Sequence, residues 1–164
     1  MVDAWLRSSA AYATVITRSR YAEDALHSAI ARGVKQYVLI GAGFDSYVLR
    51  RPPEARYIEI FEVDHPATQS FKRQRIVDCG IALRNSVHFL DADPASIGEP
   101  FLSGFDPNAL ADMLQSVGFE LQEDLDDFQV VAKYDPLGMN GLRPSRHSRI
   151  ARARVVGAVE QRPA

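Results

Sequence analysis

A short apolar run that ends in a glycine-rich turn constrains the fold of this chain more than any other feature. The run Tyr37-Val-Leu-Ile40 is followed directly by Gly41-Ala-Gly-Phe-Asp-Ser46. A strand that is apolar throughout is typical of a parallel sheet whose two faces are both covered. The sequence therefore predicts a strand that is buried on both faces and ends in a glycine turn at the ligand-binding edge of such a sheet.

Helical and strand-like segments alternate around this turn. Helices are expected over about Ala4–Ala31 with Gly33 as its stop, over Tyr47–Arg51, and from Pro66 towards Cys79 with Gly80 as its end. Strands are expected over Tyr37–Ile40, Ala55–Val63 and Ser86–Leu90. This alternation predicts an α/β fold with a right-handed parallel sheet and helices on its faces.

The pattern changes after the third strand. A loop is expected over 95–106, followed by a helix with Asp106 as N-cap and Pro107 at its first position, ending at Gly118. An edge-like strand over 119–123, a weak helix from Asp124 and a last strand over 149–159 complete the chain. The arginines between Arg143 and Arg154 recur about every three residues and could share a helix face. Such a tract is either a solvated C-terminal face or tail, or a site that binds a polyanion.

Length and composition narrow the class of protein. The 164 residues predict one domain, residues 1–164, and a formal net charge of −2 offers no global positive field for nucleic acid. Cys79 is the only cysteine, and the four histidines lack ligand spacing, so no metal site is expected. No apolar run approaches a membrane span or a secretory signal, so the default expectation is a soluble cytoplasmic protein.

Acidic side chains follow the predicted strands at the edge that carries the glycine turn. Glu62 and Asp64 come about 20 residues after the glycines, where a carboxylate binds ribose hydroxyls, and Asp91 and Asp93 end the third strand. Ser46 replaces the third glycine of a dinucleotide fingerprint, and the Gly-Lys-Ser/Thr of a P-loop is absent. His65 either acts as a general base at this edge or caps the turn. Taken together, the positions favour a ligand site over solvated loop acids.

Several motifs resemble one known family. These are Arg18-Ser-Arg-Tyr-Ala-Glu-Asp24, Gly33-Val-Lys-Gln-Tyr-Val-Leu-Ile-Gly-Ala-Gly-Phe-Asp-Ser46 and Phe61-Glu-Val-Asp-His-Pro-Ala-Thr-Gln69, with Lys72 following. They are similar to the leucine carboxyl methyltransferase-like O-methyltransferases, and closest to their bacterial branch. The segments 98–107 and 110–125 look like the last helix and strand of that family, so the resemblance covers about residues 15–135.

The resemblance implies an S-adenosylmethionine site on a Rossmann-like class I methyltransferase sheet. Its implied cofactor-binding residues are Arg20, Gly41, Ala42, Gly43, Asp45, Glu62, Asp64 and Asp93. In that reading Arg20 binds the methionine carboxylate, the glycines pass beneath the methionine moiety and Asp64 holds the ribose. Asp93 meets the adenine, with Asp91 as the fallback if the register slips by two residues.

Two departures from the family pattern also shape the expectation. Tyr47 stands where the family usually has arginine, and the chain passes from Asp93 almost directly to Gly98-Glu-Pro100, where relatives have a long segment with further strands. The sheet is therefore expected to be shortened, with exposed edges that a homodimer would cover.

Two functions remain open at this stage. One is O-methylation of a carboxylate or hydroxyl of a small molecule, in which proximity supplies most of the catalysis and no catalytic residue is singled out. The other is a non-catalytic binding module that retains the fold and the cofactor. A nucleotide-binding or dehydrogenase domain is disfavoured by Ser46.

Overall fold

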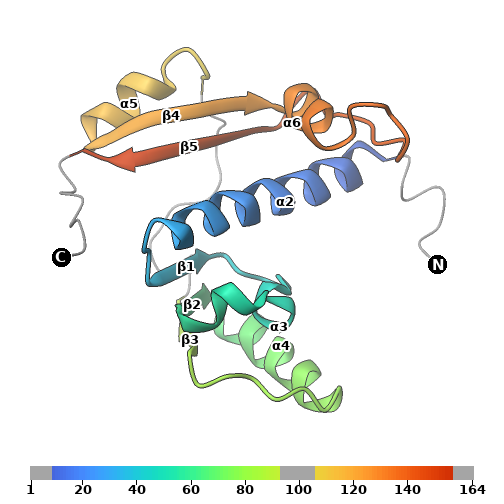
Figure 1. Cartoon of the computed structure of the whole chain (residues 1–164), viewed down its shortest axis with the longest axis vertical. Coiled ribbons are helices and arrows are strands. Elements are labelled where there is room, and N and C mark those ends of the chain that lie inside the picture. Colours follow the sequence, from blue (N-terminus) through green and yellow to red (C-terminus); the bar gives the residue numbers. More distant parts are fainter. Residues whose placement is uncertain (1–8, 93–105, 157–164) are drawn as a thin grey trace. The chain divides into compact units, whose positions relative to one another are not determined.

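The computed structural model describes residues 9–92 and 106–156. These residues form two compact units (Figure 1). We call Asp24–Leu102 the glycine-loop unit, and Met1–Glu23 together with Ser103–Ala164 the ribbon unit. The long helix α2 (Ala10–Ala31) contributes residues to both units. None of the helices in the described ranges combines the length and the apolar character needed to cross a membrane.

The glycine-loop unit contains a parallel sheet of three strands in the order β1-β2-β3. The strands are β1 (Gln36–Ile40), β2 (Glu59–Asp64) and β3 (Val87–Asp91). Ile40 pairs with Val63, and Asp64 pairs with Asp91, so the three strands end at one edge of the sheet. This arrangement confirms the α/β class that the alternating pattern predicts and the shortened Rossmann-like sheet that the family resemblance implies.

The connections of this unit are helical. They are α3 (Tyr47–Arg50), a 3₁₀ turn η1 (Pro53–Tyr57) and α4 (Pro66–Asp78). The helices confirm the prediction, but the expected strand start at Ala55 is wrong, because 53–57 form η1 and β2 begins at Glu59. The physical reason is Pro53, whose fixed φ suits the first position of a helical turn.

Gly33 ends α2 as the sequence predicts. Its φ is +96°, in the left-handed region that glycine adopts without strain. The Gly33 N–H donates to the Ile30 carbonyl at 2.9 Å, and the Val34 N–H donates to the Ala29 carbonyl at 3.1 Å. These two bonds make a Schellman motif, which satisfies carbonyls that the helix end would otherwise leave without partners.

The core of the glycine-loop unit lies on one face of its sheet. Leu26 from α2 and Tyr47 from α3 pack with Ile60 of β2, and all three are buried. Lys72 of α4 reaches Glu62, two residues further along the same face of β2. All three helices therefore cover the same face, and for the two connections that contain α3 and α4 this is what right-handed crossovers along one strand order require.

The opposite face of this sheet carries an apolar patch, which we call the bare face, beside the ion pair of Glu59 and His88. The patch consists of Val38, Ile40, Phe61, Val63 and Leu90, of which Val38 is 54% and Ile40 is 85% exposed. The expectation that the first strand is buried on both faces is therefore wrong. In the described part of the chain the crossovers supply helices to one side only, and no further crossover covers the other.

The ribbon unit contains a two-stranded antiparallel sheet. Its elements are α5 (Leu110–Ser116), β4 (Phe119–Asp126), α6 (Asp127–Tyr134) and β5 (Arg149–Val155). The two strands confirm the predicted edge-like strand and last strand. Their register shifts by one residue between Leu121 and Glu123, which marks a bulge.

The arginine tract is not a helix, which corrects the shared helix face that its spacing suggested. Its second half is β5, and the strand opposite, β4, is acidic. The cross-strand ion pairs are Arg149–Asp124 at 3.0 Å, Arg152–Glu123 at 3.6 Å and Arg154–Glu120 at 2.7 Å. Opposite charges that face each other across a ladder stabilise the pairing, so the tract serves the ribbon itself.

Two helix starts in the ribbon unit differ from the expected ones. The Asp106 carboxylate accepts a bond from the Asn108 N–H at 3.0 Å, which closes a local turn, and α5 begins only at Leu110. The helix expected from Asp124 begins at Asp127, because Asp126 forms a capping box with Gln129. In both places the carboxylate of an aspartate accepts a hydrogen bond from a backbone N–H two or three residues later. Around Asp106 this bond belongs to a turn before the helix, and at Asp126 it caps the first turn of α6.

The first half of α2 is joined to the ribbon through polar contacts. The Thr14 hydroxyl donates to the carboxylate of Asp127, which is buried, and the Tyr21 hydroxyl donates to Glu123. Burial, followed by the hydrogen bond to Glu123, raises the pKa of Tyr21 to about 12.

Candidate functional site

The loop after β1 carries the glycines that the sequence singles out. Gly41 has a φ of +69° and Gly43 a φ of +50°, both in the left-handed region. A Cβ added to Gly41 would meet nothing within 4 Å, so the backbone conformation and not the available space requires glycine there. The N–H of Gly41 donates to the Val63 carbonyl at 2.8 Å, which ties the loop to the end of β2.

Asp64 stands at the end of β2 and holds this loop from the other side. One of its carboxylate oxygens accepts a hydrogen bond from the Gly43 N–H, and the other accepts from the His65 N–H at 2.6 Å. An ionised carboxylate offers about four lone-pair positions. Two positions therefore remain for donors from a ligand, such as the two hydroxyls of a ribose.

The residues around the glycines shape the turn into α3. Ala42 is buried, and the carboxylate of Asp45 accepts from the Tyr47 N–H at 2.7 Å. Phe44 is 64% exposed and meets the ring of Phe71 edge-on, with centroids 5.8 Å apart. Asp45 thus fixes the chain reversal after the loop, and one of its oxygens is already engaged there.

Glu62 lies inside the unit. Its side chain is 1% exposed and pairs with Lys72 at 2.6 Å. Burial raises the pKa of Glu62 above its usual range, and the hydrogen bond and charge of Lys72 act in the opposite direction. Because Glu62 is two residues before Asp64 on the same strand, this buried ion pair anchors the end of β2 that presents Asp64.

Gln69 of α4 fixes the ends of two strands at once. Its side-chain amide donates to the Glu62 carbonyl at 2.9 Å and to the Leu90 carbonyl at 2.8 Å. Sequence reasoning missed this role for Gln69 and for Lys72. Gln69 lies three residues after the predicted helix start at Pro66, and Lys72 lies three residues further on, a spacing that places both side chains on one helix face.

His65 caps α4. Its imidazole Nδ1 accepts a hydrogen bond from the Ala67 N–H at 3.1 Å. Of the two alternatives for this residue, the structure shows the cap. Pro66 occupies the first position of the helix, where a missing N–H costs nothing.

The remaining predicted site residues fall in three places. Asp91 ends β3 in register with Asp64, and the Ala92 N–H donates to the Asp64 carbonyl at 2.9 Å, so Asp91 lies at the same sheet edge. Asp93 lies outside the described residues. Arg20 is exposed on α2 in the ribbon unit, where it lines a cavity of about 360 Å³ with Tyr12 and Asn140.

The glycine-loop unit therefore brings together most of the residues that the sequence predicts for the cofactor. These are Gly41, Ala42, Gly43, Asp45, Glu62 and Asp64. They combine a glycine loop, whose backbone is hydrogen-bonded to the end of β2, with a carboxylate at the end of that adjacent parallel strand. This is the arrangement that binds nucleoside-containing ligands in α/β proteins. No group of three or more His, Cys, Asp or Glu able to hold a metal ion occurs among the described residues.

Comparison with known proteins agrees with this geometry. Residues 2–110 match the leucine carboxyl methyltransferase family. The chain belongs to that family. The match includes the glycine loop, β2, α4 and β3, and it ends at the first residue of α5, so the likeness of the later elements to the family remains a prediction.

Individual relatives support the same assignment. The chain is 36% identical over 89 residues to a protein of Bacillus subtilis, 43% over 60 residues to one of Streptomyces coelicolor, and 37% over 81 residues to one of Parafrankia. Each of these carries the name "Putative S-adenosyl-L-methionine-dependent methyltransferase". The matched stretches cover 54%, 36% and 49% of this chain but only 29%, 20% and 26% of those relatives.

Proposed function

We propose that the glycine-loop unit binds S-adenosylmethionine and that the protein is an S-adenosylmethionine-dependent O-methyltransferase. The observation that carries this proposal is the bond from the Gly43 N–H to the Asp64 carboxylate, which joins the ends of two adjacent parallel strands. The names of the relatives and the family match support it.

The residues present fit this cofactor. The Gly41–Gly43 loop runs beneath the methionine moiety, and Asp64 has two lone-pair positions left for the ribose hydroxyls. Asp91 lies at the same sheet edge and can meet the adenine amine, whereas the proposed roles of Asp93 at the adenine and of Arg20 at the methionine carboxylate rest on the family resemblance alone. Asp45 and Glu62 complete the set by fixing the turn and the strand end. The bound cofactor supplies a methyl group on a sulfonium, and the protein supplies orientation.

The proposed acceptor is a carboxylate or hydroxyl oxygen of a small molecule. Transfer of a methyl group needs that oxygen in line with the sulfonium carbon, so positioning carries most of the rate enhancement. The alternative is a non-catalytic module that binds the cofactor alone. This alternative is supported by the fact that the chain matches less than a third of the length of each of these relatives.

We further propose that residues 1–164 act as one functional domain and assemble as a homodimer. Support comes from the bare face and from β1, a sheet edge among the described strands. The edge strand carries no charge, proline or bulge that would discourage pairing. A second copy offers the same apolar surface, which a two-fold axis can bury against the first.

A methyl-transfer assay distinguishes the two functions. The chain is incubated with cofactor labelled in the methyl group and with panels of small carboxylic acids and phenols. Label that enters an organic product with the wild type but not with Asp64→Ala supports the enzyme. Cofactor binding without label in any product supports the non-catalytic module.

A further inference from the structure

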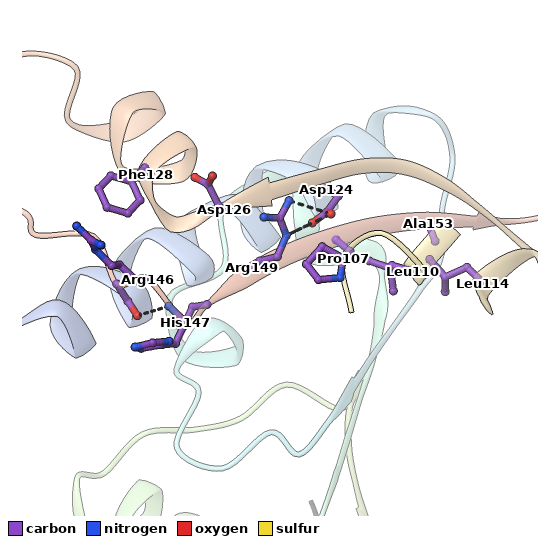
Figure 2. Close-up of a pocket in the computed structure, with 13 residues that line it drawn as sticks. Pro107, Leu110, Leu114, Asp124, Asp126, Phe128, Arg146, His147, Arg149 and Ala153 are labelled. Carbon is purple, nitrogen blue, oxygen red and sulfur yellow. Dashed lines mark hydrogen bonds and ion pairs between the residues drawn. The ribbon is translucent and has the colours of Figure 1, made fainter. Parts of the chain in front are cut away.

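The ribbon unit contains a pocket that the cofactor site does not use. Its volume is about 840 Å³, and it lies over one face of the β4–β5 ribbon (Figure 2). Ala151 and Ala153 form a floor of small side chains, and Leu110 and Leu114 from α5 form an apolar wall. This volume and this mainly apolar lining are typical of small-molecule sites.

The acidic residues that line the pocket are already engaged. The guanidinium of Arg149 holds Asp124 through two nitrogens, each 3.0 Å from a carboxylate oxygen. Asp126 accepts a hydrogen bond from the Gln129 N–H at 2.8 Å as the N-cap of α6. Arg149 thus compensates the charge of Asp124, and the N-terminus of α6 offsets part of the charge of Asp126.

Arg146 supplies a positive charge that has no ion-pair partner among the described residues. This arginine lines the pocket. Figure 2 shows Arg146 near Phe128, at the end of the pocket away from Leu110 and Leu114. The pocket thus has a cationic, aromatic end and an apolar end.

The segment that carries Arg146 is held in place by its neighbours. The Ser145 N–H donates to the buried carboxylate of Asp127 at 2.9 Å, and the His147 N–H donates to the Ser145 hydroxyl at 3.1 Å. Asp127 also accepts from Thr14 of α2. A charged group on an anchored backbone loses less freedom on binding, so more of its attraction is available to a ligand.

We propose that this pocket binds an aromatic carboxylate, with its ring system on Ala151 and Ala153 and its carboxylate at Arg146. The flat floor of alanines accepts a planar ring, whereas the two leucines enclose one side of it. Arginine presents a planar fork of N–H donors that matches a carboxylate. The proposal is independent of the cofactor site, because every residue that carries it belongs to the ribbon unit.

The test is calorimetric titration of the full chain with 2-naphthoate, with 2-naphthamide as its neutral counterpart. We expect saturable binding of the naphthoate and at least tenfold weaker binding of the amide, because a charge-assisted bond exceeds a neutral one. Arg146→Gln should weaken naphthoate binding about tenfold or more and leave amide binding nearly unchanged. Arg143→Gln makes the same change of charge in the same tract outside the pocket lining, and should leave both unchanged.

A filling variant locates the ring. Ala151→Phe should remove binding of both probes, whereas Val38→Glu on the bare face should not affect either. Arg146 is exposed, so its variant should keep the wild-type urea midpoint and remains informative if Ala151→Phe fails to fold. Absent binding, equal losses in Arg146→Gln and Arg143→Gln, or binding that disappears with Val38→Glu and persists in Ala151→Phe would each overturn the proposal.

Discussion

The carboxylate of Asp64 accepts a hydrogen bond from the backbone N–H of Gly43, and this bond joins the loop after β1 to the end of β2. The same carboxylate accepts from the His65 N–H, so the side chain orders the loop before any ligand arrives. A ligand that binds at this edge meets a loop whose conformational entropy has already been lost, which lowers the cost of binding.

The left-handed backbone of Gly41 makes a first prediction. Gly41→Ala should lower the free energy of unfolding by about 1–2 kcal/mol, because a Cβ strains this conformation although the space around it is open. Gly41→Asn should lose less, since asparagine tolerates the left-handed region. Urea unfolding of the three proteins measures the difference, and an alanine variant as stable as the wild type would contradict the account.

The buried ion pair of Glu62 and Lys72 makes a second prediction. Lys72→Met leaves a buried carboxylate without its partner and should cost about 3–5 kcal/mol at neutral pH. Lys35→Met, a change of an exposed lysine in the same unit, should cost far less. The double variant Glu62→Leu/Lys72→Met should recover much of the loss, because well-packed apolar residues can replace a buried ion pair.

The pH dependence of that loss has a defined sign. Burial raises the folded-state pKa of Glu62 above its unfolded value, so the folded state holds the proton more tightly. The resulting stability is present below the unfolded pKa and is lost as pH rises through the folded pKa. In Lys72→Met the folded pKa rises further, so the deficit in unfolding free energy should shrink as pH falls from 8 towards 5 in urea titrations.

Tyr21 makes a third prediction. Its pKa of about 12 reflects burial and the bond to Glu123. Glu123→Gln removes the acceptor charge and should move the pKa of Tyr21 back towards its usual value. Carbon-13 NMR of labelled tyrosine, with Tyr21→Phe to assign the signal, measures the shift. Because the folded pKa is raised, the Tyr21 contribution to stability is lost as pH rises from about 10 to 12.

The bare face makes a fourth prediction. Light scattering should give the mass of a dimer for the wild type and of a monomer for Val38→Glu, which places a charge at the centre of the proposed contact. Val77→Glu replaces another exposed valine, on α4, and should remain a dimer. A wild-type monomer, or equal dissociation by both variants, would rule out this face as the dimer contact.

The sequence predicts the local elements of this fold well where a pattern and a stop signal coincide. The apolar run before Gly41 predicts β1 to within one residue, and Gly33 predicts the end of α2 because few other residues adopt its φ freely. The start of β2 is missed because the pattern of apolar residues around Tyr57 resembles a strand, whereas Pro53 begins a turn. The strand propensity of the residues around Tyr57 is outweighed there by the fixed φ of Pro53, which starts a helical turn.

Features that depend on distant residues are less accessible from sequence. The burial of Glu62 and its pairing with Lys72 require a helix to pack on a particular face of β2. The exposure of Val38 could not be predicted for a related reason. An apolar strand indicates that both faces of a sheet can be covered, but the strand itself does not show whether the chain supplies the helices that would cover them. The roles of the arginines on β5 likewise depend on acids about 25 to 34 residues earlier.

Isothermal titration with S-adenosylmethionine and S-adenosylhomocysteine tests the central claim most directly. Wild type and Asp64→Ala are titrated beside Asp112→Ala, which removes an exposed acid on α5. The account predicts micromolar binding that Asp64→Ala abolishes and Asp112→Ala preserves. Absence of binding to either ligand in the folded wild type, or binding that survives Asp64→Ala unchanged, would contradict the assignment of this loop as the cofactor site.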